Sequence, residues 1–145
     1  MDADPLLERA RRHVIASGNG AAAPHRRLAS GASLVRVASV ISVEDVRYTP
    51  AVAVFEGHDD APVSFYVTEF ERGDGTPLHL HPYPEVFLVE RNTALFTAGE
   101  EELTVTAGHF VVVPAHTPHR YVGASDEAVR VVSVHPCGKV EQTNL

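Results

Sequence analysis

Residues 73–92 read GDGTPLHLHPYPEVFLVERN, a stretch that brings His79, His81 and Glu85 close together along the chain. Side chains of an extended strand alternate between its two faces, so His79 and His81 point the same way. If Glu85 also points inward, the three side chains form a His/His/Glu cluster that is open to a fourth ligand. Such groups bind divalent first-row transition metals. The stretch therefore predicts where function resides, and it leaves the reaction open.

A succession of short strands surrounds this stretch. Valine is frequent, and β-branched residues favour strands over helices. Turn signals with glycine, aspartate or glutamate separate the apolar runs. The predicted strands span residues 34–41, 51–55, 63–71, 77–81, 85–91, 93–97, 102–106, 110–113, 119–122 and 129–135. Because the gaps between them leave no room for crossover helices, the pattern predicts an all-β antiparallel barrel.

The N-terminal part of the chain follows a different pattern. Asp4 is a good helix cap, and Pro5 fits the first helical position, where no amide donor is needed. Apolar residues at helical spacing then predict a short amphipathic helix over residues 5–16, followed by a linker rich in Ala, Gly and Ser. We therefore divide the chain into an N-terminal helix and linker arm (residues 1–33) and a barrel with a short C-terminal tail (residues 34–145).

Length, charge and cysteine content limit the possible functions. At 145 residues the chain has the size of one domain, and its only cysteine, Cys137, excludes an intramolecular disulfide and a cysteine-based metal site. The net charge of −7 argues against nucleic acid as a partner, which requires clustered Lys and Arg. No apolar run approaches the roughly 20 residues needed to span a bilayer. We expect a cytoplasmic protein that acts on neither nucleic acid nor membranes.

Two motifs in the chain resemble the conserved motifs of the cupins. The first contains Gly73, His79, His81, Glu85 and Asn92, and the second contains Gly108, Pro114, His116 and His119. The resemblance covers roughly residues 34–136 and implies a double-stranded β-helix, or jelly-roll barrel, in which the two motifs face each other. It also implies a metal site formed by His79, His81, Glu85 and His119. One divalent transition metal is expected there: Fe, Mn, Ni, Zn, Cu or Co.

The sequence departs from the family pattern at three turn positions. Asn92 and His116 replace glycines, and Gly123 replaces an asparagine. Asn adopts a positive φ readily, and His is enriched in that conformation. We therefore expect the turns to keep their geometry, and all four candidate ligands are present.

Strand alternation also predicts the residues beside the metal. If Glu85 and His119 face inward, then Phe87, Val89 and Tyr121 do so too. Phe87 and Tyr121 either line a ligand cavity or fill the barrel core, and the sequence does not separate these alternatives. We expect Tyr121 to act as a proton-handling or orienting group. One of Phe65 and Tyr66 is expected to join the cavity wall.

The remaining aromatic and histidine residues near the motifs are expected to lie outside the metal site. Tyr83 is predicted at the barrel rim, and His116 in an exposed turn. His109 and His135 are expected to have structural or surface roles, because they lie at the ends of predicted strands.

Two functions remain open at the level of the sequence. The first is a metal-dependent enzyme, such as a dioxygenase or isomerase, that acts on a small organic substrate inside the barrel. The alternative is a non-catalytic barrel that is stabilised by its metal and binds or senses a small ligand. The resemblance and the unpartnered apolar stripe of the N-terminal helix also predict a homodimer.

Overall fold

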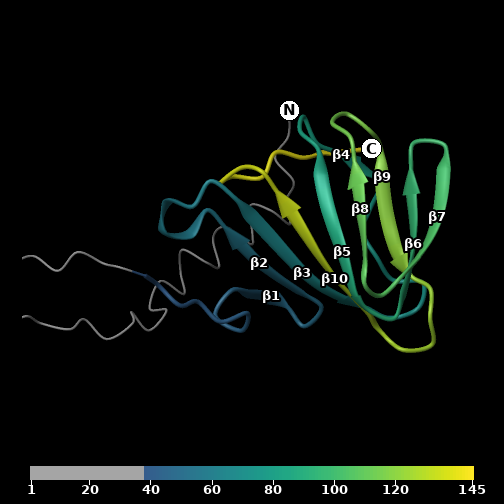
Figure 1. Ribbon diagram of the computed structural model, residues 1–145, viewed down its shortest axis with the longest axis horizontal. Helices are drawn as coiled ribbons and strands as arrows, with labels where there is room; N and C mark the ends of the chain where they lie inside the picture. The colour runs from purple at the N-terminus through teal and green to yellow at the C-terminus, as the bar shows by residue number, and fades with distance from the viewer. Residues whose placement is uncertain (1–37) are drawn as a thin grey trace, which may run out of the picture.

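The computed structural model describes residues 38–145, and this part of the chain consists almost entirely of antiparallel strands (Figure 1). The predicted helix at residues 5–16 and its linker lie outside the described residues. The strands are β1 (Arg47–Thr49), β2 (Val52–Glu56), β3 (Ser64–Phe70), β4 (His79–Leu80), β5 (Glu85–Arg91), β6 (Thr93–Ala98), β7 (Glu101–Thr106), β8 (His109–Val113), β9 (His119–Gly123), β10 (Val129–His135) and β11 (Thr143–Asn144). The described part also has a 3₁₀ turn at His58–Asp60. The prediction of an all-β antiparallel fold is confirmed.

The strands form two sheets that enclose one core. One sheet has the strand order β1-β2-β3-β10-β5-β8, and the other has the order β11-β4-β9-β6-β7. Phe87 of the first sheet packs edge-on against Phe96 of the second, with ring centroids 5.2 Å apart. Tyr121 stacks on Phe96 at 5.1 Å, and valines of β5, β8 and β10 complete this buried cluster. The jelly-roll expectation therefore agrees with the observed architecture.

Alternating burial explains which side chains face the barrel interior. In β10, Val129, Val131, Ser133 and His135 are buried, while the residues between them are half-buried. In β5, Glu85, Phe87 and Val89 are buried in the same alternating way. Since side chains of a strand alternate between its faces, the buried set of each strand points into the barrel. The predicted inward orientation of Phe87 and Val89 is confirmed.

The turn residues that depart from the family pattern adopt the expected backbone conformation. Asn92 has a φ of 62° and His116 a φ of 61°, so both occupy the left-handed region. Gly123 is required for a different reason. A Cβ atom at this position would lie 2.5 Å from the carbonyl oxygen of Glu71, so only glycine permits this close approach of the two backbones.

The sequence analysis was wrong about one strand and missed two short ones. Residues 38–41 form no strand, and residues 34–37 of the same predicted strand lie outside the described part. β1 and β11 were not predicted. They are three and two residues long, whereas a periodic pattern becomes visible only over about four residues or more. Within the described residues, no helix is long and apolar enough to cross a membrane.

Candidate metal centre and ligand cavity

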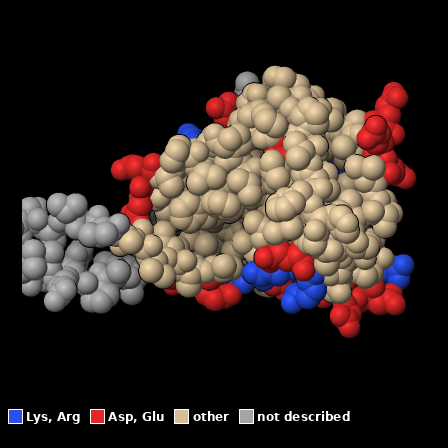
Figure 2. All heavy atoms as spheres, viewed as in Figure 1, with Lys and Arg blue, Asp and Glu red and all other residues tan. Residues whose placement is uncertain are grey.

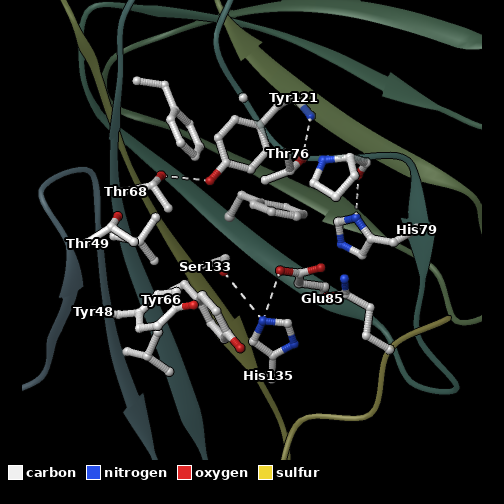
Figure 3. A pocket seen from close by; sticks show the side chains of 17 residues that line it. Tyr48, Thr49, Tyr66, Thr68, Thr76, His79, Glu85, Tyr121, Ser133 and His135 are labelled. Atoms are coloured by element: carbon white, nitrogen blue, oxygen red, sulfur yellow. Dashed lines mark hydrogen bonds and ion pairs between the residues drawn. The ribbon is translucent and has the colours of Figure 1, made fainter. Parts of the chain in front are cut away.

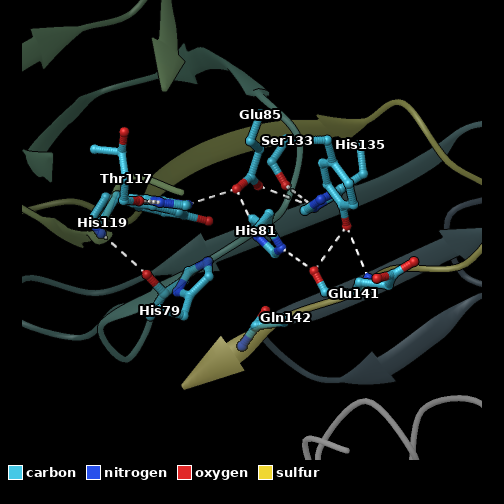
Figure 4. Close-up of polar contacts among 12 residues, drawn as sticks. His79, His81, Glu85, Thr117, His119, Ser133, His135, Glu141 and Gln142 are labelled. Atoms are coloured by element: carbon cyan, nitrogen blue, oxygen red, sulfur yellow. Dashed lines mark hydrogen bonds and ion pairs between the residues drawn. The ribbon is translucent and has the colours of Figure 1, made fainter. Parts of the chain in front are cut away.

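Both sheets contribute to the candidate metal centre. β4 carries His79, and its neighbour β9 carries His119 directly opposite. His81 follows β4, and after the turn at Pro82–Pro84 the chain enters the other sheet with Glu85, the first residue of β5. This short connection explains why one sequence motif supplies ligands to both walls of the barrel. Figure 4 shows the four side chains converging on one another.

The four predicted ligands form one compact, buried group. One potential ligand atom from each of His79, His81, Glu85 and His119 lies within 4.8 Å of all the others. The Oε2 atom of Glu85 is 2.8 Å from Nε2 of His119 and 3.1 Å from Nε2 of His81. All four side chains are buried. The structure therefore brings together the complete set of residues that the two motifs predict.

Backbone carbonyls orient the three histidine rings. The Nδ1 atom of His79 donates to the carbonyl of Pro77 at 2.7 Å, that of His81 to Glu141 at 2.5 Å, and that of His119 to Thr117 at 2.8 Å. A carbonyl oxygen only accepts hydrogen bonds, so each Nδ1 must carry its proton. Each ring can then present an unprotonated Nε2 to a metal, which is the usual arrangement at metal-binding histidines.

A buried nitrogen atom without a hydrogen bond also fits a metal. Nε2 of His81 is inaccessible to solvent and makes no hydrogen bond, although it faces the carboxylate of Glu85 at 3.1 Å. Buried polar atoms normally have a partner, because leaving them unsatisfied is costly. Three imidazoles and one carboxylate suit a divalent transition metal far better than calcium or magnesium, which prefer oxygen ligands.

The close contacts change the charge states within the cluster. Burial lowers the pKa of His79 to about 4, which keeps this ring neutral at pH 7. Burial acts to raise the pKa of Glu85, but the contacts with His119, His135 and His81 outweigh it and hold this pKa well below its usual value. Burial acts to lower the pKa of His119, yet its hydrogen bond to Glu85 raises it. Glu85 is therefore the negatively charged residue of the cluster, and its carboxylate contacts His81, His119 and His135.

His135 is the residue of this centre that the sequence analysis missed. It was expected in a structural or surface role, but it is buried, and its Nε2 lies 3.1 Å from Oε1 of Glu85. The register of β10 against β5 pairs Val134 with Val86 and so brings His135 next to Glu85. The alternation of β10 offered a signal, since it places His135 on the same face as Val131 and Ser133.

The C-terminal segment covers one side of the centre. The backbone of Glu141 accepts the hydrogen bond from His81 and another from the Tyr83 hydroxyl at 3.1 Å. The ring of Tyr83 stacks on that of His81, with centroids 5.2 Å apart and an angle of 8° between the planes. Just beyond, β11 pairs with β4. The C-terminal segment therefore supports the candidate metal ligand His81. Tyr83 packs against His81 and is not itself one of the four candidate ligands.

A cavity of about 240 Å³ opens beside the cluster (Figure 3). His79 and Glu85 form its metal end, and residues of β1, β2, β3, β5, β9 and β10 form its walls. Phe87 and Tyr121 line this cavity and also belong to the buried core, so both sequence alternatives for these rings hold at once. Of the two candidates on β3, Tyr66 lines the cavity, whereas Phe65 packs against Phe55.

The Tyr121 hydroxyl is held inside this cavity wall. It forms a hydrogen bond of 2.7 Å with Oγ1 of Thr68, and both side chains are buried. Burial raises the pKa of Tyr121 well above its ordinary value, so the phenol keeps its proton at neutral pH. In contrast, His116 is exposed, as predicted, and His109, for which a structural or surface role was expected, is exposed as well; neither belongs to the cluster.

Comparisons with known proteins agree with this architecture. Residues 66–135 match the family model described as a cupin domain, and this range includes all four candidate ligands and His135. Among solved structures, an oxalate decarboxylase from Lactobacillus farciminis in complex with formate is similar, with 18% identity and a TM-score of 0.64 over 72% of this chain and 35% of that chain. A comparison with curated proteins found no matching relative.

Oxalate decarboxylase from Bacillus subtilis is also similar. One variant shares 17% identity at a TM-score of 0.59 over 65% of this chain, and another structure of the enzyme, described for its Mn(II) centres, shares 18% at 0.58. Each match spans 27% of the decarboxylase chain. At this level of identity the likeness concerns the fold. The family match and the four converging ligands identify residues 66–135 as a cupin domain.

Proposed function

We propose that this protein is a metal-dependent cupin that binds a small organic molecule in the cavity beside His79 and Glu85. The observation that carries the proposal is the joint orientation of the three histidines. Each Nδ1 is occupied by a backbone carbonyl, and the Nε2 atoms of His81 and His119 lie against the carboxylate of Glu85. Such rings are prepared to bind one metal ion without rearranging.

A bound transition metal would supply Lewis-acid or redox chemistry to an oxygen-bearing substrate. Fe, Mn, Ni, Zn, Cu and Co are all compatible with this donor set. A metal-dependent dioxygenase or isomerase is the reaction class that we propose. It is supported by the cavity, because a substrate there would lie directly against two of the metal ligands.

Within such an enzyme, Tyr121 is proposed to orient the substrate. Its hydroxyl is fixed by Thr68 at 2.7 Å, and its raised pKa makes proton transfer at neutral pH unfavourable. This refines the expectation from the sequence, which left proton handling and orientation both open. Tyr121 lines the same cavity as Glu85.

A non-catalytic, ligand-binding cupin is the second candidate, and one observation favours it. Apart from the metal cluster and its neighbour His135, the described residues of the cavity wall offer hydroxyl and amide groups but no further carboxylate, amine or thiol. Turnover that depends on added metal would support the enzyme. Tight ligand binding with no turnover in the presence of metal and oxygen would support the binding protein.

A homodimer and a cytoplasmic location are also proposed. β8 lies at the edge of its sheet and exposes Phe110 (70%) and Val112 (64%), two apolar side chains on one face. An edge strand of this kind is suited to contact a second copy of the chain. The cytoplasmic location is compatible with a sequence that contains a single cysteine.

Elemental analysis of protein purified without a histidine tag tests the proposal. We expect about one transition-metal ion per chain and its loss in a His79→Ala/His119→Ala double variant. His109→Ala is the matched control, because it removes an exposed histidine outside the cluster. Retention of stoichiometric metal by the double variant, with the fold confirmed by circular dichroism, would overturn the assignment of the site.

A further inference from the structure

We propose that the cavity takes a single-ring organic molecule that carries at most one negative charge, with the charged oxygen at the metal end. This inference rests on the proposed function and adds the chemical class of the ligand. It is drawn from three features: the residues that line the cavity, the volume of the cavity, and the charge at its metal end.

The described residues of the cavity wall include one carboxylate and no cationic side chain. Glu85 is the carboxylate, and neither Lys nor Arg is among these lining residues. Figure 2 shows that uncharged residues make up most of the face in view, whereas the charged side chains lie mainly around its margin. A ligand that enters the cavity therefore leaves water for an environment without compensating positive side chains.

The charges at the metal end limit how many anionic groups a ligand can carry. Histidines that bind a metal are neutral, so a divalent ion and the carboxylate of Glu85 together leave one positive charge. One anionic oxygen of the ligand balances this charge. A second carboxylate would be buried without a partner, and burial of an unpaired charge is strongly unfavourable.

The rest of the cavity is suited to an uncharged ring. Val54 and Phe87 are buried apolar wall residues, and Tyr66 adds an aromatic face. The hydroxyls of Thr68 and Tyr121 are bonded to each other, so this polar pair is neutral and requires no charged partner on the ligand. A cavity of about 150 Å³ lined by apolar residues binds benzene in another protein. The volume of about 240 Å³ therefore accommodates one ring with small substituents.

This class of ligand differs from the substrate for which the structural neighbours are named. Those proteins are oxalate decarboxylases, and oxalate carries two carboxylates on two carbon atoms. Oxalate would leave most of the apolar wall uncovered and would bring one charge more than the metal end can balance. The shared fold therefore does not extend to a shared ligand.

Isothermal titration calorimetry with metal-loaded protein provides the test. Phthalate and phthalamate have nearly the same shape, but phthalate carries two carboxylates, whereas phthalamate carries one carboxylate and one neutral amide. We expect phthalamate to bind at least 10-fold more tightly than phthalate and than oxalate. Equal or tighter binding of either dianion, or no binding of phthalamate at millimolar concentration, would overturn the inference.

A charge placed in the wall gives an independent readout. Tyr48 lines the cavity on β1, away from the four ligands, so Tyr48→Arg adds a cation there. We expect this variant to improve the affinity for phthalate relative to phthalamate at least threefold. Thr104→Arg, on the exposed face of β7, adds the same charge outside the cavity. This variant should leave the ratio of the affinities for phthalate and phthalamate unchanged.

The two proposals fail in different ways. Absence of bound metal in the wild-type protein would overturn the proposed function before any ligand is added. Stoichiometric metal together with a preference for phthalate or oxalate would overturn the ligand class and leave the metal site intact. If a folded Tyr48→Arg variant has the wild-type ratio of affinities for phthalate and phthalamate, this result also counts against the ligand class.

Discussion

His135 holds the oxygen of Glu85 that the other histidines leave free. Its Nε2 lies 3.1 Å from Oε1, whereas His81 and His119 contact Oε2 of the same carboxylate. The two oxygens of Glu85 therefore have separate partners, which fix the plane of the carboxylate. A residue that contacts a metal ligand without binding the metal itself orients that ligand. It thereby changes the affinity of the protein for the metal.

Removal of His135 is expected to weaken metal binding without abolishing it. We predict that His135→Ala lowers the metal affinity by about 10- to 100-fold, which is the usual effect of losing such a partner. His135→Gln retains a donor and should recover part of the loss. Competition with a chelator whose colour depends on bound metal measures both affinities. A His135→Ala protein with wild-type affinity would contradict the positioning role.

The metal-free protein is expected to lose stability on mild acidification. Burial lowers the pKa of His79 to about 4 from an ordinary value of 6.5, so between these values the unfolded chain binds a proton that the folded chain does not. The free energy of unfolding then falls with decreasing pH, by about 2 kcal/mol between pH 6.5 and pH 5. The raised pKa of His119 contributes a loss only above pH 6.5, and the depressed pKa of Glu85 adds to the loss at lower pH.

Urea unfolding in the presence of a chelator measures this dependence. The His79→Gln variant should lose less stability than the wild type between pH 6.5 and pH 5, because it lacks the titrating ring. Equal pH slopes for the two proteins would show that His79 is not the group responsible.

Replacement of Tyr121 by phenylalanine is expected to separate ligand binding from metal binding. The change removes the hydrogen bond to Thr68 and should lower the free energy of unfolding by about 1 kcal/mol. If Tyr121 orients the organic ligand, the affinity of the variant for that ligand should fall by about 2- to 10-fold while its metal content stays unchanged. Tyr48→Phe, which removes another hydroxyl of the cavity wall, is the control. Unaltered ligand binding and turnover in Tyr121→Phe would remove this role.

A charge on the exposed face of β8 is expected to disrupt a dimer. Phe110 is 70% exposed, so Phe110→Glu should leave the barrel folded. If β8 forms the interface, the variant should be monomeric where the wild type is dimeric, because a buried unpaired carboxylate opposes association. Size-exclusion chromatography with light scattering gives both masses. A monomeric wild type would refute the dimer, and a dimeric variant would place the interface elsewhere.

Much of the fold was accessible from local sequence patterns. The bounds of β5 and β10 agree with the predicted ranges 85–91 and 129–135, because both strands are seven residues long and alternate clearly. The positive φ of Asn92 and of His116 followed from the residue types that such turns tolerate. β1 and β11 escaped prediction because strands this short are specified by their partners in the sheet.

The sequence by itself determined the all-β fold and the identity of the four candidate ligands. Their spacing in two motifs is a local property, and alternation along each strand sets which side chains face inward. Only the tertiary structure decided which distant groups support them. His135 reaches Glu85 through the register of β10 against β5, and Glu141 accepts from His81 across 60 residues of sequence. The cavity wall, whose described residues include no Lys or Arg, is likewise assembled from six strands, because the closure of the barrel gathers side chains that no single segment contains.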